Sequence, residues 1–183
     1  MLDFESTNST EEDGLSIPPV LDPLMQLAYR AKSRIFSNSW GSPTCEYTHY
    51  AMEIDRFVYF HDDFVILIAA GNAGPGERTI SAPGTAKNVI TVGASQNAHA
   101  SSLNSKPAYW DNLKELFPVH FYHYADENLA SFSSSGPTCD GRVKPDVVAP
   151  GEYILSSRSS NPNSNLLWMR GTSMATPITT NAV

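Results

Sequence analysis

A run of seven apolar residues, Phe64 to Ala70 (FVILIAA), is followed directly by Gly71 and Asn72. This run constrains the fold more than any other feature of the sequence, because no polar residue interrupts it and both of its faces must be buried. Such a strand is typical of the centre of a parallel sheet that carries helices on both faces. The run therefore predicts an α/β fold.

Helical and extended segments alternate around this run. Asp22 and Pro23 predict a helix start, with the carboxylate as N-cap and the proline at the first helical position. Side-chain spacing predicts helices over about 23–32 and 45–61, and strands at 35–39, 88–94 and 144–151, the last of them buried. Together these segments predict a doubly wound, mostly parallel sheet with helices on both faces. Ligands bind such sheets beyond the carboxyl ends of the strands.

The bulk composition restricts the classes of partner. A chain of 183 residues with 41% hydrophobic and 17% charged residues has the composition of one globular domain. The net charge of −7, with Lys and Arg scattered singly, leaves no basic stripe to neutralise phosphates, so we expect no nucleic-acid partner. No apolar run approaches the ~18 residues of a membrane span, and we expect none in this chain.

The chain divides into an arm and one domain. Residues 1–20 are polar and contain a double proline, which is typical of a flexible arm or linker. Residues 21–183 form the domain, in which 96–128 is polar and then aromatic-rich, and is interpreted as a surface insertion. The chain ends ten residues after Ser173, where a helix has only begun, so we expect a truncated domain.

The two cysteines, Cys45 and Cys139, stand beside turn residues in polar surroundings. Two are too few to define a disulfide framework. The sequence favours free loop thiols, with a bridge between them as the alternative.

The segment GTSMATP (residues 171–177) places Ser173 where a helix begins. Backbone N–H groups and the positive end of the helix converge there, so a serine hydroxyl could attack a carbonyl group while its own N–H binds the oxyanion. The simpler alternative is a plain Ser/Thr helix cap, which is the more common use of a lone serine.

A glycine-rich loop, GNAGPG (residues 71–76), follows the apolar run and contains Asn72. An amide at a strand end can direct its NH₂ group at a developing negative charge. The alternative is an ordinary turn in which Asn tolerates a left-handed conformation. The loop matches neither GxGxxG nor a phosphate loop with its lysine, which disfavours nucleotide binding.

Six segments in order give the sequence a specific resemblance. They are SNSWG (37–41), IAAGNAGPG (68–76), ISAPGTAKNVITVGA (80–94), FSSSGP (132–137), VKPDVVAPG (143–151) and GTSMATP (171–177). This series resembles the subtilisin-like serine peptidases, the subtilase family, from about residue 21 to 183.

The resemblance implies a role for each matching position. Ser173 corresponds to the nucleophile and Asn72 to the side-chain donor of the oxyanion hole. The two walls of the S1 pocket, which receives the substrate side chain before the cleaved bond, correspond to Ser39-Trp40-Gly41 and Ala69-Ala70-Gly71. Ser81 falls near the pocket floor, where the family implies a cis peptide bond at Ala82-Pro83.

The catalytic partners of the nucleophile are missing from the matching pattern. In this family the triad follows the chain order Asp, His, Ser, yet nothing before Ser39 resembles an Asp-Thr-Gly or His-Gly-Thr motif. All five histidines lie later in the chain and lack the required context: His49, His61, His99, His120 and His123. We therefore expect them to be solvated or packing residues and this chain alone to be inactive.

The resemblance implies a serine endopeptidase that cuts polypeptides through an acyl-enzyme. The alternative is a non-catalytic pseudopeptidase or binding module on the same fold, and upstream Asp and His motifs would discriminate between them. We expect no cofactor and no metal, since a structural calcium occurs in the family but has no support here. The family implies an extracellular or secretory location. If Asn72 and Ser173 share one oxyanion hole, their donor atoms must lie within roughly 6 Å of each other.

Overall fold

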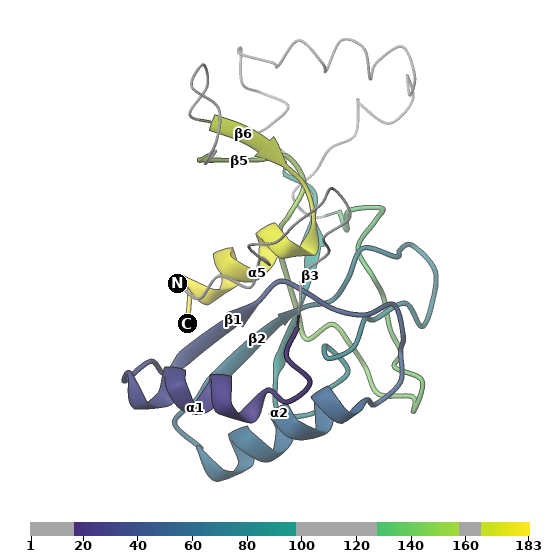
Figure 1. Cartoon of the computed structure of the whole chain (residues 1–183). Helices are drawn as coiled ribbons and strands as arrows, with labels where there is room; N and C mark the ends of the chain where they lie inside the picture. The colour runs from purple at the N-terminus through teal and green to yellow at the C-terminus, as the bar shows by residue number, and fades with distance from the viewer. Residues whose placement is uncertain (1–16, 98–127, 158–165) are drawn as a thin grey trace, which may run out of the picture.

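The computed structural model describes residues 17–97, 128–157 and 166–183. Four strands form one parallel sheet (Figure 1). Their order across the sheet, β1-β2-β3-β4, is the same as their order along the chain. The strands are β1 (Ile35–Asn38), β2 (Val65–Ala69), β3 (Ile90–Ser95) and β4 (Val147–Pro150). The predicted α/β fold with parallel neighbours is thus confirmed.

Helices cover both faces of the sheet, as the burial of β2 requires. On one face, α1 (Asp22–Arg30) and α2 (His49–Phe60) pack with alternate strand residues that include Ile66 and Ile68. The other face is covered by α5 (Thr172–Thr180), as Figure 1 shows. There the core contains Leu67 and a group of small side chains. Because successive strand residues point to opposite faces, the unbroken apolar run supplies both cores.

The start of α1 differs from the prediction. The N-cap position is Leu21, and Asp22 and Pro23 lie inside the first turn with no side-chain cap. The Leu21 N–H donates to Glu53 Oε2 on α2 (2.7 Å), so a side chain of the neighbouring helix holds the N-cap residue, and Asp22 does not cap the helix.

The predicted helix over 45–61 also begins late, at His49. Residues Ser42 and Thr44 pair with Ala82, and Cys45 forms a disulfide with Cys139. These long-range contacts keep the segment out of a helix up to Thr48. The reading of the cysteines as free loop thiols is therefore wrong, and the bridged alternative is correct.

The fourth strand is present within 144–151 but is not buried as predicted. Val147 and Val148 are 40% and 53% exposed, because β4 ends the order of the four-stranded sheet. Ala149 is the β4 residue that is buried in the core on the α5 side. After β4, the sequence prediction missed an antiparallel hairpin of β5 (Ile154–Ser157) and β6 (Leu166–Met169), which projects away from the sheet (Figure 1).

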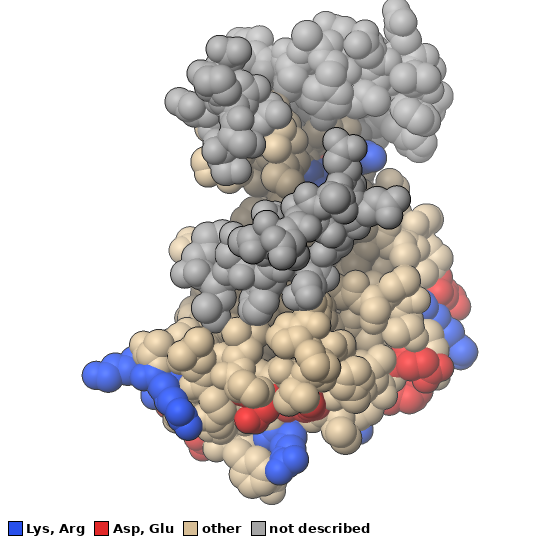
Figure 2. Space-filling view, viewed as in Figure 1, with Lys and Arg blue, Asp and Glu red and all other residues tan. Residues whose placement is uncertain are grey.

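Two predicted segments lie largely outside the described residues: the arm over 1–20, of which only 17–20 are described, and the insertion over 96–128. No helix in the described ranges is long and apolar enough to cross a membrane. Lys and Arg side chains form small separate groups beside Asp and Glu, with no continuous basic surface on the described part of the face in Figure 2.

Candidate active site

Three segments meet at the carboxyl end of the sheet. Ser39-Trp40-Gly41 follows β1, Ala70-Gly71-Asn72 follows β2, and the first turn of α5 lies beside both. The sequence placed the first two at this edge from topology alone. The position of α5 brings Ser173 to the same edge.

The Asn72 side chain is fixed by the residue before Ser173. Its Oδ1 accepts hydrogen bonds from Thr172 N (2.9 Å) and from Thr172 Oγ1 (3.0 Å). A backbone N–H can only donate, so this contact requires the amide oxygen and determines which way the amide is turned. The Asn72 NH₂ group is thereby directed away from Thr172.

Asn72 Nδ2 and Ser173 N approach a common point. A carbon built as a Cβ on Gly171 would lie 3.6 Å from Asn72 Nδ2 and 3.6 Å from Ser173 N. The two nitrogens are therefore no more than twice that distance apart, although 100 positions separate Asn72 from Thr172. The two donors therefore lie near each other, while the expected separation of roughly 6 Å stays a prediction, because this upper bound is slightly wider.

Ser173 and Ser39 bond reciprocally. The Ser173 hydroxyl donates to the Ser39 carbonyl (3.2 Å), and the Ser39 hydroxyl donates to the Ser173 carbonyl (3.0 Å). Pro177 has no N–H to donate four residues back in α5, so the Ser173 carbonyl lacks its helical partner. The Ser39 hydroxyl satisfies this free carbonyl and ties the end of β1 to the helix start.

The floor between the two predicted walls is closely packed. Ser81 N donates to Ala70 O (2.8 Å), and Ser42 N donates to Ala82 O (2.8 Å), so the floor bonds to both sides. A Cβ on Gly41 would lie 2.9 Å from Ala82 O, and one on Gly71 would collide with the Ser81 hydroxyl. Only glycine fits at these two places.

The remaining predicted wall residues fall in the expected region. Ala69 and Ala70 are buried, and Trp40 packs edge-on against Tyr50 with ring centroids 5.8 Å apart. The Ala82-Pro83 bond is cis, as the resemblance predicts.

No described histidine lies beside Ser173. His49 begins α2 and His61 is its C-cap, on the face of the sheet opposite α5, where His61 stacks on Phe57 at 4.0 Å. His99, His120 and His123 lie outside the described residues. Nearer α5, burial raises the pKa of Glu152, and the positive charge of Arg170 partly opposes that rise.

Sequence reasoning missed two residues that position the site. Thr172 orients Asn72 and also accepts from Gly71 N through its hydroxyl (3.2 Å). Ser134 braces the Asn72 loop, because its hydroxyl accepts from Ala73 N (3.0 Å) and its N–H donates to Gly71 O (3.0 Å). Both residues lie in segments that carried the resemblance, GTSMATP and FSSSGP, and that is the only signal that could have pointed to them.

A family model described as the subtilase family matches residues 19–183. This chain belongs to the subtilase family. The match begins before α1 and extends through α5, so it includes every described element of the subtilase chain.

Two relatives of this subtilase carry the name of serine protease. It is similar to the serine protease/ABC transporter B family protein tagD of Dictyostelium discoideum, with 36% identity across 91% of the chain and 13% of that protein. It is also similar to serine protease AprX of Bacillus subtilis, with 39% identity across 62% of the chain and 24% of that protein. The chain therefore spans a quarter or less of the length of these relatives.

Solved structures show the same fold. The prenylagaramide maturation protease PagA superposes with a TM-score of 0.59 at 19% identity, covering 92% of this subtilase chain and 49% of that chain. Sphericase gives a TM-score of 0.52 at 23% identity, covering 86% and 44%.

Proposed function

We propose that this subtilase chain is part of a serine endopeptidase that hydrolyses peptide bonds through an acyl-enzyme. Ser173 is the nucleophile, and Asn72 Nδ2 and Ser173 N are the oxyanion donors. The observation that carries the proposal is the position of these two nitrogens, each 3.6 Å from one point above Gly171. Thr172 N donates to Asn72 Oδ1 and so engages the oxygen of the amide, which leaves the Asn72 NH₂ group able to donate to a substrate.

The proposed reaction proceeds in two halves. Ser173 Oγ attacks the carbonyl carbon, and the negative charge that forms on the oxygen is stabilised by the two donors and by the positive end of α5. The amine leaves with the proton that a general base took from Ser173, as the ester to Ser173 forms, and water then cleaves that ester. The backbone of Ser39-Trp40-Gly41 and Ala69-Ala70-Gly71 receives the polypeptide as an added strand, with Ser81 near the pocket floor.

A general base must take the proton from Ser173, and none is present among the described residues. The hydroxyl instead donates to the Ser39 carbonyl, which is too weakly basic to deprotonate it. We infer that residues 1–183 alone do not reach the rate of a complete triad, and that Asp and His come from elsewhere in the full-length protein.

A fluorophosphonate probe tests the proposal, because it reacts with an activated serine. We expect the full-length natural protein to be labelled stoichiometrically at Ser173, and the Ser173→Ala variant to remain unlabelled. Chain 1–183 should label far more slowly than an intact serine peptidase. Rapid labelling of chain 1–183 would show that the base argument is wrong.

The same experiment decides the alternative. A full-length protein that folds but neither labels nor cleaves a peptide library is a non-catalytic module on the subtilase fold. The Cys45–Cys139 disulfide supports an oxidising compartment, and we propose an extracellular or secretory location on that ground. We propose no cofactor, and the described residues hold no cluster of three or more metal-ligating side chains.

A further inference from the structure

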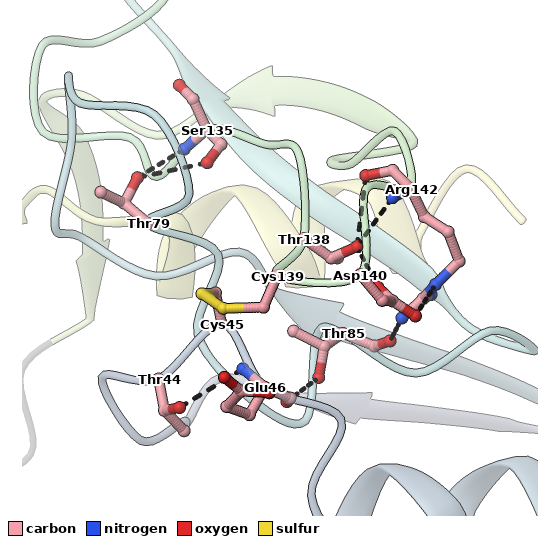
Figure 3. The surroundings of a disulfide bond; sticks show 10 residues. All are labelled: Thr44, Cys45, Glu46, Thr79, Thr85, Ser135, Thr138, Cys139, Asp140 and Arg142. Atoms are coloured by element: carbon pink, nitrogen blue, oxygen red, sulfur yellow. Dashed lines mark hydrogen bonds and ion pairs between the residues drawn. A yellow bond between two sulfur atoms is a disulfide. The ribbon is translucent and has the colours of Figure 1, made fainter.

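A disulfide between Cys45 and Cys139 lies next to the proposed S1 pocket. It joins residues 94 positions apart with a Cα–Cα distance of 5.2 Å, and Cys139 N also donates to Cys45 O (3.1 Å). Figure 3 shows the bridge between the segment that contains Thr44 and Glu46 and the turn that contains Asp140 and Arg142. Both cysteines are half-buried, so a small reductant can reach them.

On one side, the bridge follows directly after the segment that pairs with the pocket floor. Ser42 N donates to Ala82 O (2.8 Å), and Ala82 N donates to Thr44 O (2.9 Å). Thr44 immediately precedes Cys45. The disulfide therefore anchors the end of a short antiparallel pairing that joins one pocket wall to the floor.

On the other side, the turn over 138–142 holds the far end of the floor loop. Arg142 Nη2 donates to Thr85 O (2.6 Å), and the Thr85 hydroxyl donates to Glu46 O (2.9 Å), beside Cys45 (Figure 3). A closed ring of contacts thus runs from Cys45 through Cys139, Arg142 and Thr85 back to Glu46.

The same segment braces the second wall. Ser134 N donates to Gly71 O (3.0 Å), and Thr79 N donates to Ser135 O (2.9 Å). Residues 133–142 consequently contact the wall after β2 through Ser134, and through the disulfide they contact the segment that follows the wall after β1. The disulfide is the one covalent bond among these contacts around the floor at Ser81 and Ala82.

We propose that the Cys45–Cys139 disulfide positions the floor and walls of the S1 pocket and so determines how sharply the enzyme discriminates among substrate side chains. This inference rests on the proposed peptidase function. The cysteines touch neither the nucleophile nor the oxyanion donors, so their role is positioning. Without the bond, the hydrogen bonds of the 42–44 pairing compete with water, and the floor no longer has one fixed distance from the walls.

The test uses the full-length protein and peptides that differ only in the residue before the cleaved bond. The ratio compares kcat/KM for the best peptide with kcat/KM for the poorest peptide in this set, which runs from small to large side chains. In the Cys45→Ala/Cys139→Ala variant this ratio should fall about tenfold, which is the scale on which the fit of a side chain in its pocket discriminates between substrates. Labelling of Ser173 by a small fluorophosphonate should change less than twofold. Wild-type protein treated with a phosphine reductant and alkylated should match the variant.

A second variant and a control separate positioning from general stability. Arg142→Ala opens the same ring without touching the sulfurs and should lower the selectivity ratio in the same direction. Phe57→Leu, in the core between α2 and the sheet and outside this ring of contacts, should lower the melting temperature but leave the ratio unchanged. If the double variant does not fold, Arg142→Ala and the alkylated protein carry the test.

The outcomes are distinct. An active wild type whose ratio is the same with and without the disulfide overturns this inference alone. A ratio that falls equally in Phe57→Leu also overturns it, because the effect would then follow stability. A wild type that neither cleaves nor labels overturns the proposed function, and this inference with it.

Discussion

At the scale of single residues, the site depends on how Asn72 is turned. Its amide oxygen is held by the Thr172 N–H and hydroxyl, so the NH₂ group is presented rather than left to rotate. The Asn72 side chain is exposed, so its orientation comes from these two bonds and not from packing. Asn72 therefore joins the glycine-rich loop to the start of α5 and presents a donor at the same time.

Replacing this side chain should affect catalysis far more than folding. Asn72→Ala in the full-length protein should lower kcat by about 10²–10³-fold with little change in KM, a range measured in subtilisin, a member of this family. Loss of the Thr172 contacts should reduce the free energy of unfolding by about 1 kcal/mol. Steady-state kinetics and urea unfolding measure the two effects. If the fall in kcat is no larger than the fall in the fraction of folded protein, Asn72 is not an oxyanion donor.

At the scale of elements, the irregular segment 128–142 holds the site together without regular structure. Its turn over 138–142 is closed by Thr138 N donating to Arg142 O (2.9 Å) and by an ion pair between Arg142 Nε and Asp140 Oδ2 (2.9 Å). Arg142 then reaches Thr85 in the floor loop (2.6 Å). The position of Thr85 beside the proposed pocket therefore depends on this short polar turn.

The acid stability of this turn can be predicted from Asp140. Hydrogen bonds from Arg142 and then from Thr138 lower the pKa of Asp140 from 3.8 to about 2. Because the pKa of Asp140 is lower in the folded chain than in the unfolded chain, its carboxylate stabilises the fold at any pH above the unfolded pKa. That contribution is lost as the pH falls from about 4 to about 2. Asp140→Asn should therefore lower the melting temperature at pH 5 but not at pH 2. Melting curves with the same pH dependence in both proteins would contradict this assignment.

At the scale of the whole molecule, one sheet separates two different cores. The α1 and α2 side is filled by large side chains such as Phe57, Phe64 and Met25, whereas the α5 side is lined by alanines. Small residues let α5 lie close to β3 and β4, with which it makes extensive contact. This close approach places the start of α5 at the edge where β1 and β2 end.

The disulfide should contribute to global stability by restricting the unfolded chain. Closing a loop of 94 residues is worth about 4–5 kcal/mol in the chain-entropy model, which is an upper value. Reduced and alkylated protein should therefore unfold at a clearly lower urea concentration than oxidised protein. The midpoint of the oxidised protein with alkylating agent alone provides the control. Coincident midpoints would mean that the bond adds nothing to the native state relative to the unfolded state.

The sequence determined the centre of the fold and the candidate site. The unbroken apolar run over 64–70 requires burial on both faces, and that requirement fixes β2 in the middle of a parallel sheet. Asn72 and Ser173 follow from motifs, since each is recognised by its immediate neighbours in the chain. These features depend on local periodicity and local chemistry, which a sequence displays directly.

Other features were decided only by the tertiary structure. The pairing of Cys45 with Cys139 requires two segments 94 positions apart to come within bonding distance, and the same pairing delays the start of α2 to His49. The exposure of Val147 and Val148 depends on β4 standing at the edge of the sheet, which their apolar character cannot reveal. In each case the physical cause is a neighbour distant in sequence, and only packing brings such neighbours together.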